Sequence, residues 1–285
     1  MSLDFDVFVV DPKPIPSAVP GFEEAVGRAT WPPSTSTLIR DDDGAVLVDC
    51  LITVREGREL AAWVKSHDCE PGYVYITHPH ADHFLGLTEI LAAFPQARPV
   101  ALAESVPAME EQISAGYLQA WGGFFPGQLA DRPVVPGPLT GSTIPIGGSS
   151  ATVIPVGTTD TGHSSVVHVP DLSLVVSGDV VYNRTHMWLA GSTPDSRADW
   201  ARALDAVAAL EADTLIAGHR DPRAADDDAQ RQIDESRRYL TDFETALELS
   251  SAPGELIDRM TAAHPELANP YTLWVAAHDL LGTGT

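Results

Sequence analysis

Residues 73–83 read "YVYITHPHADH", an apolar run followed at once by three histidines and an aspartate. The first five residues are aromatic or mostly β-branched, which is typical of a buried strand. His78 and His80 lie two positions apart at the end of this strand, where alternate side chains point the same way, and Asp82 and His83 follow in the turn. The whole chain has only ten histidines. Their concentration here therefore indicates a chemical role.

Imidazole nitrogens and carboxylate oxygens together are ligands for zinc, iron or manganese. The spacing lets His78 and His80 offer nitrogens to one ion, while Asp82 and His83 offer an oxygen and a nitrogen to a neighbouring one. The motif therefore predicts a metal site with places for two ions. The ligand types alone do not choose the metal.

Three further signals lie at the ends of later apolar runs: His163 in "TGHSS", Asp179 in "VVSGDVVY" and His219 in "LIAGHRD". Each by itself has an ordinary explanation, because glycine followed by histidine or aspartate is common in turns. His168 is a rival to His163, but it falls inside the β-type run "SSVVHV". His163 occupies the glycine-led loop and is the favoured ligand.

Taken in order, these motifs resemble the metallo-β-lactamase superfamily over roughly residues 34–220. The resemblance implies an α/β fold, a four-layer αβ/βα sandwich whose site lies at one edge between two sheets. The ligands it implies are His78, His80 and His163 for a first metal, Asp82, His83 and His219 for a second, and Asp179 as a bridge.

A dinuclear metal-dependent hydrolase follows from this resemblance, with two divalent ions, zinc favoured and iron or manganese open. Two such ions sharing a water give a bridging hydroxide at neutral pH, and Asp82 would orient it. The substrate would be a small molecule with an ester-type bond: a lactone, thioester, ester or β-lactam. The chain lacks a G-x-S-x-G nucleophile motif, which disfavours a serine hydrolase.

Tyr182 stands three residues after Asp179. In the lactone-hydrolysing branch of the superfamily a tyrosine at this offset resembles it and helps to bind the carbonyl oxygen, so Tyr182 is a second candidate catalytic residue beside Asp82. A tyrosine packed at a strand end is the alternative. The role of His186, in the following loop, stays open.

Three other functions remain as alternatives. A phosphodiesterase or nuclease of the same fold is disfavoured by the formal net charge of −23, which repels polyanions. An iron-dependent redox protein is disfavoured because flavodiiron relatives commonly have glutamate where His80 stands and carry a fused flavin domain. A non-catalytic metal-binding protein is disfavoured because every expected ligand position is filled.

The remaining sequence predicts one domain over residues 1–285, with a loop insertion at about 104–150 and a helical C-terminal tail at about 228–285. The segment 121–150 is rich in glycine, proline and aromatic residues and is either a linker or a loop folded over the site. Expected strands lie at 5–10, 36–40, 45–50, 73–77, 151–156, 164–169, 172–177 and 214–218, and expected helices at 54–67, 84–94, 104–120 and 197–211.

The chain is expected to be cytoplasmic, without membrane or nucleic-acid partners. Its first thirty residues lack a signal-peptide pattern, and no segment offers 18 uncharged apolar residues. The two cysteines, Cys50 and Cys69, have no C-x-x-C spacing and suggest no disulfide framework. A small molecule is the expected partner, and a homodimer is left open.

Overall fold

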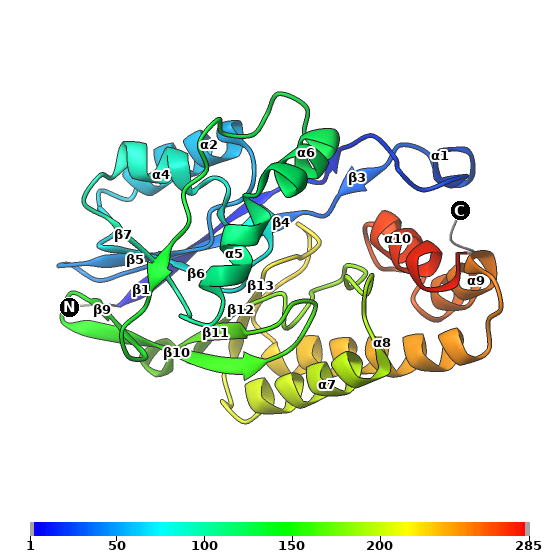
Figure 1. The fold of residues 1–285 in the computed structure, drawn as a ribbon. Helices are drawn as coiled ribbons and strands as arrows, with labels where there is room; N and C mark the ends of the chain where they lie inside the picture. The colour runs from blue at the N-terminus through cyan, green and yellow to red at the C-terminus, as the bar shows by residue number, and fades with distance from the viewer. Residues whose placement is uncertain (1–2, 283–285) are drawn as a thin grey trace.

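The computed structural model describes residues 3–282 and places two β-sheets face to face between outer helices (Figure 1). The first sheet has the order β1-β4-β5-β6-β7-β8. Its strands are β1 (Asp4–Val10), β4 (Ser34–Arg40), β5 (Ala45–Val48), β6 (Tyr73–Ile76), β7 (Arg98–Ala101) and β8 (Gly137–Pro138). The second has the order β13-β12-β11-β10-β9. Its strands are β9 (Thr143–Ile146), β10 (Ser149–Gly157), β11 (Ser164–Val169), β12 (Leu174–Gly178) and β13 (Thr214–Ala217). A small separate ribbon pairs β2 (Lys13–Pro14) with β3 (Thr30–Trp31).

Helices cover the outer face of each sheet. On the first sheet lie α2 (Val54–Lys65) and α4 (Leu87–Ala93), and on the second lie α7 (Pro194–Ala208) and α8 (Ala229–Glu248) (Figure 1). The remaining helical segments are α1 (Phe22–Ala25), α3 (Ala81–Phe84), α5 (Val106–Gln112), α6 (Ala115–Phe124), α9 (Pro253–Ala263), α10 (Pro270–Leu281) and the short 3₁₀ turn η1 (Pro170–Leu172). The predicted four-layer αβ/βα sandwich with extra C-terminal helices is confirmed.

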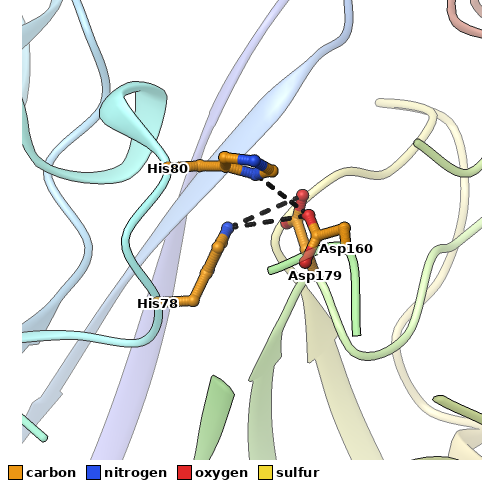
Figure 2. A group of neighbouring side chains, drawn as sticks. All are labelled: His78, His80, Asp160 and Asp179. Atoms are coloured by element: carbon orange, nitrogen blue, oxygen red, sulfur yellow. Dashed lines mark ion pairs between the residues drawn. The ribbon is translucent and has the colours of Figure 1, made fainter. Parts of the chain in front are cut away.

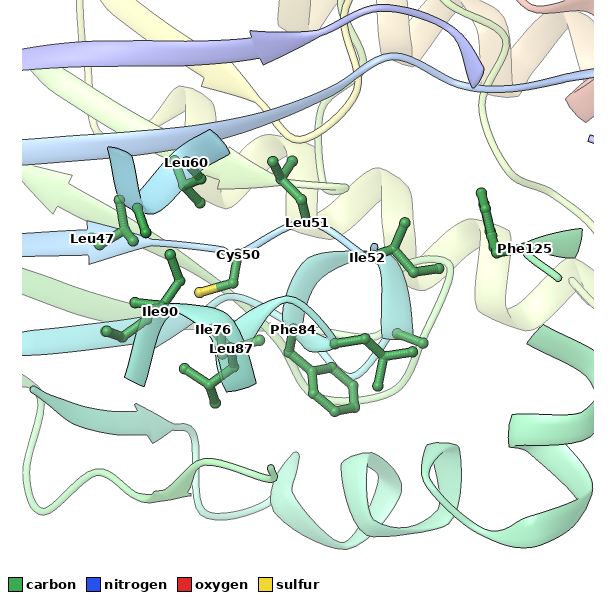
Figure 3. Close-up of a cluster of buried hydrophobic side chains, with 14 of the residues drawn as sticks. Leu47, Cys50, Leu51, Ile52, Leu60, Ile76, Phe84, Leu87, Ile90 and Phe125 are labelled. Carbon is green, nitrogen blue, oxygen red and sulfur yellow. The ribbon is translucent and has the colours of Figure 1, made fainter. Parts of the chain in front are cut away.

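The strand residues fill three apolar layers because side chains of a strand alternate between the two faces of its sheet. In β5, Leu47 points to the layer beneath α2 and α4, whereas Val46 and Val48 point to the layer between the sheets. Figure 3 shows the first of these layers, where Leu47 and Cys50 lie near Ile90 of α4. Both faces of the central strands are thus buried, which explains why β5, β6 and β12 are nearly continuous apolar runs.

Two segments differ from the sequence prediction. The helix expected over 104–120 is two helices, because Ser114 adopts an extended backbone between α5 and α6. The segment 121–150 completes α6 and then contributes β8 to the first sheet and β9 to the second. Such short strands, rich in proline and glycine, carry no clear alternation in sequence.

Strand ends from both sheets meet at one edge of the sandwich. The strands β12 and β13 are parallel neighbours, so the residues after them leave the second sheet side by side. The residue after β6 is joined to the second sheet, because the backbone N–H of Ser165 donates to the carbonyl oxygen of Thr77 at 3.1 Å. This junction brings together the predicted ligand-bearing segments that follow β6, β12 and β13.

Among residues 3–282, no helix combines the length and the apolar character needed to cross a bilayer.

Candidate metal centre

Two neighbouring groups of ligand-type side chains form at this edge. The first contains His78, His80, Asp160 and Asp179, and the second contains Asp82, His83 and His219. Within each group the candidate donor atoms all lie within 4.8 Å of one another. Figure 2 shows His78 and His80, on the loop after β6, pointing across to Asp160 and Asp179.

Asp179 stands between the two groups. One of its oxygens, Oδ2, lies 3.9 Å from Nε2 of His78 and 3.2 Å from Nε2 of His219. Its other oxygen, Oδ1, lies 3.2 Å from Nε2 of His83. A carboxylate with oxygens directed toward both sets of nitrogens is in the position that a bridging ligand needs.

Glycines precede Asp179 and His219 because the site leaves no room for a side chain there. Gly178 has a left-handed backbone with φ of 51°, and a Cβ atom at this position would lie 2.5 Å from Oγ1 of Thr77. A Cβ atom on Gly218 would lie 2.3 Å from Oδ1 of Asp179. The Gly-Asp and Gly-His pairs seen in the sequence therefore reflect close approach of backbone to ligand.

Buried partners orient the second group. Nδ1 of His83 lies 2.9 Å from Oδ2 of Asp49, and Nδ1 of His219 lies 3.0 Å from the carbonyl oxygen of Pro33. Each imidazole thereby keeps Nε2 free to face the site, as metal-binding histidines usually do. The indole N–H of Trp31 donates to Oδ2 of Asp82 at 2.9 Å. These contacts fix all three side chains before any ion binds.

His163 lies elsewhere than the resemblance implied. It belongs to neither group, its side chain is exposed and its backbone is left-handed with φ of 61°. Its place beside His78 and His80 is taken by Asp160, whose Oδ2 lies 3.0 Å from Nδ1 of His80. The loop from β10 turns Asp160 inward, where Thr159 Oγ1 donates to Asp160 Oδ1 at 2.8 Å. The sequence prediction missed Asp160 because it placed a histidine in this loop, although a carboxylate is an equally suitable donor.

The donor atoms fit a cation. Four buried atoms of these groups have no hydrogen-bond partner within residues 3–282: Nε2 of His78, Nε2 of His83, Oδ2 of Asp160 and Oδ1 of Asp179. Buried polar atoms left unpaired are costly and rare in native proteins. Divalent ions between the two groups would satisfy all four, so these residues are suited to hold metal.

The protonation states of the buried histidines depend on burial and on the neighbouring carboxylates. Burial lowers the pKa of His78 to about 4, so its imidazole is neutral at pH 7. Burial has the same tendency at His219, but the carboxylates of Asp179 and Asp82 outweigh it and raise the pKa of His219 to about 10. Without metal, His219 is therefore protonated beside the carboxylates of Asp179 and Asp82. Metal binding at its Nε2 would release this proton.

Tyr182 contacts the metal centre through Asp179, the candidate bridging ligand. Its hydroxyl donates to Oδ2 of Asp179 at 2.7 Å, and its side chain is buried. Burial and the carboxylate of Asp179 raise the pKa of Tyr182 well above its ordinary value, so the phenol stays protonated and able to donate.

His186, in contrast, lies outside both groups, where its Nδ1 is 3.0 Å from the hydroxyl of Tyr239. Burial lowers the pKa of His186 to about 3. These contacts indicate a packing role for His186.

A cavity of about 310 Å³ opens directly onto the metal centre. Residues of both ligand groups, His80, Asp82 and His219, form part of its wall. The rest of the lining is Trp31, Pro32, Gln112, Tyr117, Ala120, Trp121, Phe124, Tyr182, Trp188 and Thr272. A small molecule in this cavity would touch the ligand groups.

Solved structures of similar fold include several metallo-β-lactamases. A metallo-β-lactamase family protein from Thermus thermophilus has a TM-score of 0.64 at 17% identity, covering 97% of this chain and 92% of its own. The metallo-β-lactamase from Pontibacter korlensis has a TM-score of 0.60 at 18% identity, covering 84% and 99%. FIM-1 from Pseudomonas aeruginosa, in its mono-zinc form, has a TM-score of 0.59 at 17% identity, covering 85% and 96%. At these identities the likeness shows the fold alone.

Comparison with curated protein sequences gives no match. A family model, described as the metallo-beta-lactamase superfamily, matches residues 29–219, which contain every residue of both ligand groups. Membership and the two groups together support a metal-dependent hydrolase in general. The chain belongs to the metallo-β-lactamase superfamily.

Proposed function

We propose that the protein is a dinuclear metal-dependent hydrolase that cleaves an ester-type bond in a small molecule. The observation that carries the proposal is the shared carboxylate: Asp179 lies between two groups that each supply two or more further donors. Zinc, iron and manganese all suit this mixture of imidazole and carboxylate. When bound, a pair of such ions lowers the pKa of a coordinated water toward neutrality and polarises a substrate carbonyl.

The chain's own residues would hold and orient the reacting groups. Asp82 faces the cavity, and its Oδ2 lies 3.3 Å from Nε2 of His219, so it is placed to hold and orient a water at the edge of the second group. Trp31 fixes the direction of that carboxylate through its indole N–H. Tyr182 also lines the cavity and presents a protonated hydroxyl near Asp179. A donor at this place could turn to a developing oxyanion.

The experiment combines elemental analysis with a substrate panel. Purified protein loaded with zinc, manganese or iron is assayed against lactones, thioesters, aryl esters, β-lactams and phosphodiesters. We expect two metal ions per chain and turnover of at least one carboxylic ester class. The Asp82→Ala variant should lose turnover by about 10²–10³-fold while remaining folded, as expected for loss of a principal catalytic group.

The matched control is Asp43→Ala, which removes an exposed carboxylate in the turn between β4 and β5. It should change neither metal content nor rate. A protein that binds no more than one ion per chain at saturating metal, or a metal-replete Asp82→Ala variant with unchanged kcat, would contradict the proposal.

A further inference from the structure

The cavity beside the metal centre has a wall of aromatic rings, and we propose that this wall binds the apolar, ring-bearing part of an uncharged ester or lactone. The inference rests on the proposed hydrolase function and names its substrate class. It excludes substrates that carry a negative charge on the part that lies against the aromatic wall.

Trp31 is the centre of the wall. Its ring centroid lies 5.3 Å from that of Trp121, 5.6 Å from that of Phe124 and 5.9 Å from that of Trp188. These separations fall within the range of favourable aromatic pairs. Because the indole of Trp31 also donates to Asp82, the apolar wall begins within one hydrogen bond of a candidate ligand.

Several polar atoms of the wall are already paired. The indole N–H of Trp121 donates to Oε1 of Gln112 at 2.9 Å, and the indole N–H of Trp31 is used by Asp82. Thr272 Oγ1 accepts a hydrogen bond from Asn269. Trp31 and Trp121 therefore offer ring faces rather than hydrogen-bonding groups to whatever lies against them. Polar substituents would lose water there without compensation.

Charge complementarity points the same way. The lining of the cavity contains no lysine and no arginine, whereas Asp82 is part of it. The whole chain carries a formal net charge of −23. A carboxylate or phosphate on the part of the substrate that lies against the aromatic wall would meet no lysine or arginine side chain, and its desolvation would be unfavourable.

The helix α6 supplies much of this wall, and the rest of the protein does not bury its apolar side chains. Its sequence, "AGYLQAWGGF", is mostly apolar, yet none of its residues is buried. Tyr117 is 42% exposed and is one of the few large apolar side chains, among residues 3–282, that face solvent to this extent. An apolar ligand in the cavity would cover this surface, which gives α6 a reason to be apolar.

A small molecule fits the cavity better than a protein partner does. The volume of about 310 Å³ is at the lower end of the range for small-molecule sites. The cavity also ends on His80, Asp82 and His219, so its occupant would be held against the reacting groups. The occupant is therefore the apolar part of the substrate next to its reacting bond.

Binding without turnover provides the test. The probes are 4-phenylbutanamide, which is neutral, and the same amide with a carboxylate on the para position of its ring. Affinity is measured by calorimetry on the metal-loaded protein. We expect the neutral amide to bind at least tenfold more tightly than its carboxylated partner. The Tyr117→Ala variant should weaken the neutral amide by about tenfold, as expected for loss of one buried aromatic contact.

Two further variants keep the test independent of folding defects. Ala120→Phe should fill the cavity and abolish binding, while Leu249→Ala, which alters an exposed apolar residue 60% accessible at the end of α8, should change nothing. Equal affinity for the two amides, or unchanged binding in both Tyr117→Ala and Ala120→Phe, would overturn the inference. So would a self-association of the protein, seen by sedimentation, that the probe cannot displace.

The two proposals can fail separately. If the neutral amide binds and responds to the variants but no ester is hydrolysed, the hydrolase assignment fails and the apolar site stands. If esters are hydrolysed but the carboxylated ones are preferred, the hydrolase assignment stands and the inferred substrate class is wrong.

Discussion

The two ligand groups differ in how firmly the protein holds them. In the second group, Asp82, His83 and His219 are all buried, and each has a fixed partner behind it. In the first, the side chain of His80 is 20% exposed, and its ring faces Asp160 on the loop between β10 and β11. His78 is the best-supported member, with Thr77 Oγ1 3.0 Å from its Nδ1.

This difference indicates a rigid ion position beside a more adaptable one. The second group is fixed by buried contacts to Asp49 and Pro33, which lie beside strands of the first sheet, and to Trp31 on β3 of the small ribbon. The first group depends on a carboxylate supplied by a loop. Preorganised ligands bind metal more tightly because less ordering is needed on binding. We therefore expect the second group to fill first and exchange last.

Removing Asp179 should weaken both ion positions and so abolish the difference between them, because this carboxylate serves both groups. For Asp179→Ala we expect loss of most bound metal and a fall in kcat of about 10³-fold or more, since a principal electrostatic group is lost. Elemental analysis and steady-state kinetics measure the two effects. A variant that keeps two ions and normal turnover would show that Asp179 bridges nothing.

Exchanging residues in the β10–β11 loop should affect only the first group. Asp160→Ala should weaken the more loosely held ion by more than the roughly 10–100-fold that loss of an outer-shell partner costs, whereas His163→Ala should leave both ions in place. Competition titrations with a metal-sensitive dye distinguish the two sites. The opposite pattern, with His163→Ala losing an ion, would restore the ligand that the family resemblance implied.

A third variant in this loop examines the choice of metal. Asp160→His would give the first group a third imidazole, which favours zinc over the harder manganese ion. We expect the zinc-to-manganese affinity ratio of that site to rise relative to the unmodified protein. An unchanged ratio would mean that Asp160 does not contact the ion.

A substitution at Trp31 should weaken metal binding by the second group. Trp31→Phe keeps an aromatic ring in the wall but removes the N–H that holds Asp82. We expect a loss of about 10–100-fold in affinity for the tighter ion or in kcat, as for other partners of metal ligands. Trp121→Phe is the control for metal affinity, because its indole donates to Gln112 and not to a ligand. Similar effects of both substitutions would assign Trp31 to packing alone.

The smallest effect is expected at Tyr182. Tyr182→Phe should retain both ions and lower kcat and kcat/KM together by about tenfold, because a donor used in the transition state is lost while metal still shares the charge. Tyr239→Phe, which removes another buried hydroxyl, should shift only the free energy of unfolding, by about 1 kcal/mol. Wild-type kinetics in Tyr182→Phe would leave its hydroxyl with the role of supporting Asp179 only.

Much of the fold could be read from the sequence because its strands are strongly apolar and its turns are well marked. The strands β1, β4, β5, β6, β10, β11, β12 and β13 all lie near the positions that the sequence predicts. β8 and β9 were not predicted, because they are short and interrupted by proline and glycine, and their pairing depends on neighbours distant in the chain. The break between α5 and α6 was not predicted either, since a serine can sit within a helix or start one.

For the site, the sequence alone determined which strand ends carry ligand-type residues, because spacing and glycine context are local properties. It could not decide which residue of "TTDTGHSS" turns inward. That choice depends on the left-handed backbone at His163 and on how β10 and β11 pair, which place Asp160 beside His80. Nor could it show that Trp31 supports Asp82, a contact between residues 51 positions apart in the chain, or that α6 lies over the centre. Only packing of the two sheets and their covering helices brings these segments together.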